Sequence, residues 1–158
     1  MNDEETLDNS SRPRASKLAV AASIVAIVGL ADSIFLTVHH FTAEPVPCSI
    51  IERCDQVLTS SYAEIGGIPL AGFGAAAYFV AFALAVMTAF GDERTWRIFG
   101  VQVTLMALFS AWLVYVQAAI IGAFCQFCLI SAVTTLILFG LFIASLFLSR
   151  KTGLVSSV

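Results

Sequence analysis

Four long apolar segments, separated by short polar stretches, dominate the pattern of residues along the chain. They cover residues 18–38, 68–90, 98–121 and 124–148 and consist mostly of Ala, Val, Ile, Leu and Phe. About 20 apolar residues in a helix cross a hydrocarbon core of roughly 30 Å, and lipid leaves helix as the state that satisfies the backbone of such a segment. The pattern therefore predicts an all-α membrane protein with four transmembrane helices.

The polar segments divide the chain into one membrane domain, residues 18–148, and two tails. The tail at 1–17 is polar, with Ser, Pro and mixed charge, which favours disorder. The first apolar segment is too long for the core of a signal peptide, so we expect it to remain as an anchor. A long loop at 39–67 joins the first two spans, and a short tail at 149–158 follows the fourth.

Composition agrees with a membrane protein and excludes most soluble classes. The chain has 158 residues, of which 59% are hydrophobic and 12% charged. A soluble domain of this size has too much surface to hide so many apolar residues. We expect membrane lipid to be a partner. The charge distribution contains no basic stripe, so we predict no nucleic-acid partner.

The basic residues near the span ends predict the orientation. Four crossings put all of them on one side, which the positive-inside rule makes cytoplasmic, together with both termini. The loop at 39–67 and the turn around Gly122 then face the outside. Of Lys and Arg, the loop contains only Arg53, against four acids. The cytoplasmic set is Arg12, Arg14, Lys17, Arg94, Arg97, Arg150 and Lys151.

The four cysteines form two close pairs, Cys48/Cys54 and Cys125/Cys128. Spacing alone permits three disulfide connectivities. In the predicted topology both pairs lie on the non-cytoplasmic face, where disulfides form and persist. A zinc site needs further ligands, and the side chains of His39 and His40 diverge because they are adjacent, so we predict no metal site.

The spacing of Cys125 and Cys128 places both sulfurs on one face of the first turn of a helix. Free N–H groups and the helix dipole favour a thiolate there. An inert structural bridge is the alternative. For Cys48 and Cys54, a disulfide that only stabilises the loop is a stronger alternative to a redox role. Two disulfides within reach of each other, however, can pass electrons by thiol–disulfide exchange, and a lipid-soluble quinone is the obvious final acceptor.

Several stretches resemble the vitamin K epoxide reductase family. The sequence of residues 48–63, CSIIERCDQVLTSSYA, is similar to the outer loop of that family. The resemblance continues through GIPL at 67–70, Gly74-x-x-x-Tyr78 and Cys125-Gln126-Phe127-Cys128, and ADSIFLT at 31–37 is similar to bacterial members. It covers almost the whole of residues 18–148.

The resemblance implies a four-helix bundle around a quinone, ubiquinone or menaquinone, capped by the outer loop. It implies a quinone-dependent protein-disulfide oxidoreductase of the bacterial inner membrane that supports disulfide formation in exported proteins. A reduced thioredoxin-like protein on the outer face would attack Cys48 and free Cys54. Cys54 would attack Cys125, and Cys128 would reduce the quinone. Ser60 matches a family serine that shapes the lid of the quinone pocket.

This chain departs from the members that act on vitamin K. By ungapped count it has Leu70 and Ala132 where those members have the Asn and Tyr that contact the quinone ring, so we do not expect epoxide reduction. It ends shortly after the fourth span, without the thioredoxin domain of some bacterial members. We therefore expect the redox partner to be a separate protein.

Two polar residues inside the spans have open roles. Gln117 can donate to a quinone carbonyl or form a hydrogen bond between helices. Asp32 can take up protons or be buried as a neutral acid.

Two other functions compete with this one, and the order of the cysteine pairs argues against the first. The other bacterial four-helix quinone reductase of disulfide formation has its two cysteine pairs in the reverse order. A non-catalytic membrane protein with two structural disulfides on its outer face is the second alternative.

Overall fold

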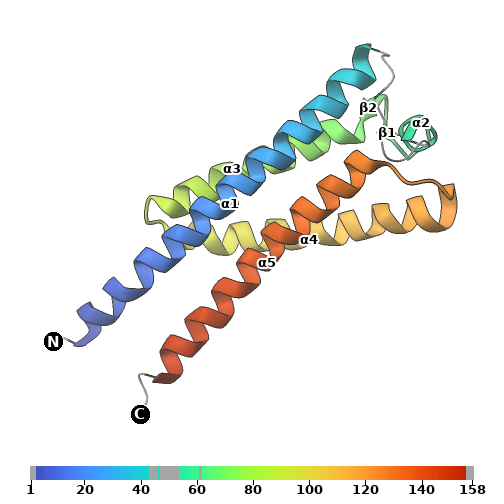
Figure 1. The fold of residues 1–158 in the computed structure, drawn as a ribbon. Helices are drawn as coiled ribbons and strands as arrows, with labels where there is room; N and C mark the ends of the chain where they lie inside the picture. The colour runs from blue at the N-terminus through green and yellow to red at the C-terminus, as the bar shows by residue number, and fades with distance from the viewer. Residues whose placement is uncertain (1–2, 43–45, 47–53, 61, 156–158) are drawn as a thin grey trace.

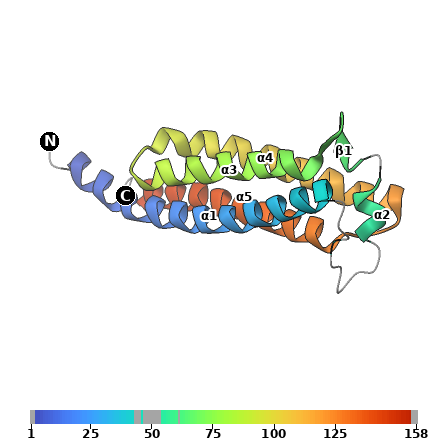
Figure 2. The same ribbon diagram turned by 90° about the horizontal axis from the view of Figure 1, so that it is seen from above.

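The computed structural model shows an elongated bundle of long helices (Figures 1 and 2). It describes residues 3–42, 46, 54–60 and 62–155, and side chains over 17–42, 46, 56–60, 62–92 and 94–148. The prediction of an all-α membrane bundle is confirmed. Within the described part, four helices have the length and composition to cross a membrane, over Lys17–Thr42, Leu70–Ala89, Arg94–Ile121 and Gln126–Leu148.

The long helices are α1 (Asp3–Thr42), α3 (Leu70–Ala89), α4 (Glu93–Tyr115) and α5 (Gln126–Val155). The sequence favours disorder for residues 1–17, whereas the structure continues α1 as a helix back to Asp3. Once a span has formed a helix, adding a further turn avoids the cost of nucleation. The composition of a flanking segment does not show that it can extend an existing helix in this way.

Small residues hold α1 against α3, the most extensive helix contact of the bundle. Ala22 and Ala26 of α1 and Ala81 and Ala85 of α3 are fully buried. Small side chains let two helix backbones approach closely, which is how helices associate where lipid removes the hydrophobic driving force. Large apolar side chains on the outer surfaces of the bundle are exposed, as expected for helices that face lipid.

A short turn joins α3 to α4 at the end of the bundle where both chain termini lie (Figures 1 and 2). Asp92 caps α4, because its Oδ1 accepts the backbone N–H of Arg94 at 3.1 Å and its Oδ2 accepts the Thr95 hydroxyl. The Thr95 hydroxyl holds the pKa of the Asp92 carboxyl below its usual value. This end contains no cysteine among the described residues.

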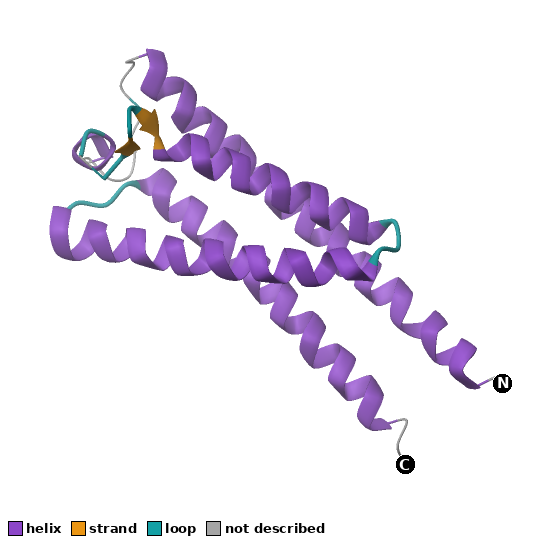
Figure 3. Cartoon of the chain, turned by 180° about the vertical axis from the view of Figure 1, so that it is seen from behind, coloured by secondary structure: helices purple, strands orange, loops and turns teal. Residues whose placement is uncertain are grey.

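The opposite end carries a cap built from the loop between α1 and α3. The cap contains the short helix α2 (Cys54–Leu58) and a hairpin of β1 (Glu64–Ile65) and β2 (Ile68–Pro69), drawn in orange in Figure 3. Gly66 and Gly67 form its two-residue turn with φ of 62° and 83°. Such turns need positive φ at both positions, which explains the Gly-Gly pair.

Candidate functional site

A cavity of about 460 Å³ lies inside the capped end of the bundle. All four long helices and the cap contribute to its walls. Its volume is within the range of sites that bind small molecules, which are mostly apolar with a few polar groups. The apolar part of the wall includes Leu36, Leu70, Leu105, Met106, Phe109 and Leu113.

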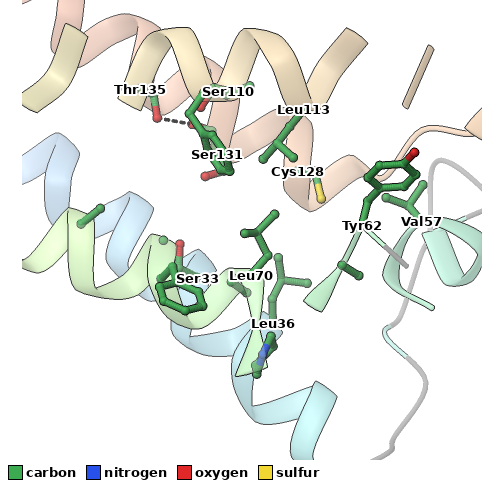
Figure 4. Close-up of a pocket in the computed structure, with 18 of the residues that line it drawn as sticks. Ser33, Leu36, Val57, Tyr62, Leu70, Ser110, Leu113, Cys128, Ser131 and Thr135 are labelled. Carbon is green, nitrogen blue, oxygen red and sulfur yellow. Dashed lines mark hydrogen bonds between the residues drawn. The ribbon is translucent and has the colours of Figure 1, made fainter. Parts of the chain in front are cut away.

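The structure separates the two thiols of the C-x-x-C. Cys128 lines the cavity, and Figure 4 shows its sulfur on the cavity side, between Leu113 and Tyr62. Cys125 is fully buried and packs instead against Val57 of α2 and Ala123. Both cysteines are free thiols in the structure. One sulfur is therefore available to a ligand in the cavity, and the other is turned toward the cap.

The start of α5 explains this separation. Cys125 directly precedes the helix, and its carbonyl accepts the N–H of Leu129 at 3.0 Å, while Cys128 lies inside the first turn. A hydrogen bond from the Cys128 thiol lowers the pKa of Cys125, although burial opposes this effect. The backbone N–H groups of Cys128 and Phe127 lower the pKa further. Of the two thiols, Cys125 is therefore the one whose ionised form, the thiolate, is favoured by its hydrogen bonds.

Gln117 supports the backbone at this point. It lies in a π-helical segment, η1 (Val116–Ile121), which continues α4 and ends at Gly122 in the left-handed conformation, with φ of 67°. Its side chain is buried, and its Oε1 accepts the backbone N–H of Cys125 at 2.9 Å. This bond joins η1 to the residue that precedes α5, and a contact of Gln117 with a quinone carbonyl stays a prediction. Gln117 also lines the cavity.

The other residues predicted to contact a quinone, Ser60, Leu70 and Ala132, also line the cavity. The Ser60 hydroxyl donates to the carbonyl of Val57 at 2.7 Å and so fixes the end of α2. Their role in binding a ligand remains a prediction.

The predicted loop pair is only partly described. Cys48 lies outside the described residues. Cys54 is the first residue of α2, and its side chain is not described. Val57 lies one turn further along α2 and contacts Cys125. The helix that begins at Cys54 is therefore packed against the buried thiol.

Sequence reasoning missed a polar cluster on the cavity wall. The hydroxyl of Tyr78, which is buried, donates to the carbonyl of Ser131 at 2.7 Å and lies 2.7 Å from Oγ1 of Thr135. Ser131 and Thr135 also line the cavity and are labelled in Figure 4. Their spacing from Cys128, three and seven residues, is the sequence signal that places them on one face of α5.

Asp32 of α1, singled out in the sequence as an ionisable residue inside a span, also lines the cavity. The site thus combines two thiols of different surroundings with a mostly apolar cavity.

A model of one protein family matches residues 20–143 of the chain, from α1 to α5. That family is described as the vitamin K epoxide reductase family, and the matched residues include all four cysteines.

Proposed function

The chain belongs to the vitamin K epoxide reductase family, a family of oxidoreductases, and from this membership we propose that it is a quinone-dependent protein-disulfide oxidoreductase. The observation that carries the proposal is the separation of the two inner thiols. Cys128 opens to the apolar cavity, and Cys125 faces the helix that begins at Cys54. A relay needs this arrangement, since each thiol exchanges electrons with a different partner.

The residues of the cavity fit a quinone. The walls are mostly apolar, which suits a lipid-soluble ring and tail, and Cys128 contributes a thiol to the described part of the wall. A quinone bound there would accept two electrons. Ser60, Leu70, Gln117 and Ala132 would line its site, and Cys128 would face its ring. Either ubiquinone or menaquinone has the required chemistry.

The proposed relay is a series of thiol–disulfide exchanges that begins outside the bundle. A reduced thioredoxin-like protein attacks the Cys48–Cys54 disulfide at Cys48, which frees the Cys54 thiolate, and the second thiol of the partner then displaces Cys48 and closes the partner disulfide. Cys54 then attacks Cys125 in the Cys125–Cys128 disulfide and releases Cys128. Cys48 resolves the mixed disulfide, so the loop pair is oxidised again and the inner pair is left as a dithiol.

The inner dithiol then gives two electrons and two protons to the acceptor, and the Cys125–Cys128 disulfide re-forms. The sum of the cycle is one partner disulfide and one quinol. Closure of the disulfide joins Cys125 to Cys128 as the electrons leave, and the lowered pKa of Cys125 helps because the thiolate is the form that makes the new bond. The oxidised partner then makes disulfides in exported proteins.

We also propose that both termini are cytoplasmic and that the cysteines face the periplasm across a bacterial inner membrane. The basic residues next to the spans support this orientation. The cap and the C-x-x-C lie at one end of the bundle and the two termini at the other (Figure 2). Such an arrangement agrees with four crossings and with redox chemistry on the outer side.

A turnover assay tests the function. The purified protein in lipid nanodiscs is mixed with a reduced thioredoxin-like protein and a quinone, and loss of partner thiols is followed together with quinol formation. The wild type should turn over, and Cys128→Ser should not. A non-catalytic protein with structural disulfides, the second candidate, predicts no turnover in the wild type. Equal turnover in Cys128→Ser would exclude the proposed relay.

A further inference from the structure

The cavity has a polar inner end, which we call the cavity floor and define as Asp32, Tyr78, Gln102 and Thr135. These residues come from α1, α3, α4 and α5, one from each long helix. Asp32 lies about 15 Å along α1 from its last residue, Thr42, at 1.5 Å per residue. In Figure 4 Thr135 and Ser33 lie at the side away from Tyr62 and Val57 of the cap.

Asp32 differs from the other floor residues in its hydrogen bonding. Tyr78 bonds to Ser131 and lies against Thr135, and Nε2 of Gln102 donates to the carbonyl of Ala77 at 2.8 Å. Oδ2 of Asp32 is buried and has no hydrogen-bond partner in the described part of the chain. A buried polar atom left unpaired is costly, and an oxygen of a ligand bound in the cavity would pair with it.

The surroundings of Asp32 favour a carboxyl that holds its proton. Among the described residues of the cavity wall there is no Lys or Arg to pair with a carboxylate. His40 lies at the capped end, with its Nε2 3.9 Å from Oε2 of Glu64. An ionised carboxylate without a positive partner is expensive in apolar surroundings, whereas the neutral acid can donate a hydrogen bond to a ligand oxygen. The titratable groups of the wall besides Asp32 are His40 and Tyr62 toward the cap, Tyr78 on α3 and Cys128 on α5; α4 presents none there.

We propose that Asp32 is the acid that protonates the quinone oxygen farther from Cys128, an inference that rests on the proposed function. A quinone has oxygens at opposite sides of its ring, and a ring that meets Cys128 with one side presents the other to the floor. The Cys125/Cys128 dithiol supplies two electrons and forms its disulfide. Asp32 gives its proton to the floor-side oxygen. Of the two protons that the thiols release, one goes to the quinone oxygen nearer Cys128 and the other reprotonates Asp32. The sum is quinone plus dithiol giving quinol plus disulfide, with no net proton consumed.

The test compares Asp32→Asn, which keeps the shape but holds no acidic proton, with Asp32→Glu, which restores the acid. Asp92→Asn is the matched control, because it makes the same carboxyl-to-amide change at the exposed cap of α4, a position that Asn also caps well. Each variant is reduced at all cysteines and mixed with quinone, and the single-turnover rate of quinol formation is recorded against pH. Two further readouts are the infrared band of a protonated carboxyl in quinone-free protein and the affinity for quinone.

We expect Asp32→Asn to form quinol roughly 100-fold more slowly, the scale of a lost general acid. Its rate should lose the decline at high pH that the wild type shows when Asp32 ionises, and its infrared spectrum should lose the carboxyl band. The affinity for quinone should change less than about threefold, and Asp32→Glu should recover most of the rate. Proton donation of this kind changes the rate and its pH profile, which a merely structural carboxyl would not do.

Three results would overturn the inference. One is an unchanged rate and pH profile in Asp32→Asn, and another is a carboxyl band that is absent from the wild type. The third is a loss of quinone affinity large enough to explain the whole loss of rate, which would make Asp32 a binding group alone. A wild type that forms no quinol at all would refute the proposed function itself, and the infrared band would still report whether Asp32 holds a proton.

Discussion

The backbone N–H of Cys125 donates a 2.9 Å hydrogen bond to Oε1 of Gln117. Gln117 belongs to η1 and Cys125 immediately precedes α5, so the bond crosses the turn at Gly122 that joins these two segments. Ala123 adds a backbone bond to the carbonyl of Gln117 at 3.2 Å. Together these bonds fix the direction in which α5 starts, and with it the different surroundings of the two thiols.

Gln117→Met should destabilise the protein and slow quinone reduction. The substitution keeps the length of the side chain but leaves the buried N–H of Cys125 without its acceptor, at a cost of about 1–3 kcal/mol. The melting temperature in detergent and the single-turnover rate check this prediction. Gln56→Met on the exposed surface of α2 is the matched control and should leave the melting temperature unchanged. Equal melting temperatures for the two variants would refute a supporting role for Gln117.

The ionisation of Cys125 should depend on Cys128. Because the hydrogen bond from Cys128 is the largest cause that lowers the pKa of Cys125, Cys128→Ala should raise that pKa more than Cys128→Ser, which keeps a hydroxyl donor. A lowered pKa means that thiolate accumulates at lower pH, so its appearance in Cys128→Ala should move to higher pH. Ultraviolet thiolate absorbance during a pH titration, with Cys48 and Cys54 replaced by Ser, measures this shift. Identical curves for both variants would contradict the assignment.

Gly29→Ala should destabilise the contact between α1 and α3. A Cβ at Gly29 would overlap the ring of Tyr78, which is buried and held at its hydroxyl by Ser131. Overpacking of this kind costs about 1–3 kcal/mol. Gly140→Ala on α5 is the control, since a Cβ there meets nothing within 4 Å. Thermal unfolding should show a lower melting temperature for Gly29→Ala alone, and a similar value for both would argue against this packing.

The direction of the relay predicts one mixed disulfide. In Cys48→Ser, Cys54 is a free thiol and attacks Cys125. The residue at position 48 can no longer break the resulting Cys54–Cys125 disulfide, so this disulfide should accumulate. Mass spectrometry of peptides prepared without reductant identifies the bonded pair. A Cys54–Cys128 bond in its place would reverse the roles of the inner thiols, and the absence of both bonds would count against exchange between the pairs.

The transmembrane helices could be predicted from the sequence because a bilayer leaves an apolar segment few backbone conformations other than a helix. A span such as residues 98–121 has no other way to satisfy its backbone in a bilayer, so its apolar composition alone predicts a helix. Flanking segments lack this constraint, and the structure continues α1 through residues 3–17 against their polar composition. The Gly66-Gly67 pair is a local signal for the hairpin, whereas the polar character of residues 39–67 by itself predicts only a loop.

The cavity was harder to predict because its walls come from segments far apart in the chain. Ser60, Leu70, Gln117 and Ala132 were named from a resemblance, and they meet only after the four helices have packed. The hydrogen bonds of Tyr78 to α5 depend on the relative rotation of two helices, which a sequence pattern does not specify. The π-helical turn at Gln117 has no composition signal of its own, although such turns often occur at functional sites.

In the proposed mechanism, Cys128 passes electrons from the inner dithiol to a quinone in the cavity. The most direct measurement uses protein in which Cys48 and Cys54 are replaced by Ser, reduced and mixed with quinone in the absence of any partner. Quinol formation and closure of the Cys125–Cys128 disulfide are followed in the same sample. We expect a single equivalent of quinol, formed together with the disulfide, and none when Cys128 is also replaced by Ser. Quinol formation that persists without Cys128, or a disulfide that closes without quinol, would contradict it.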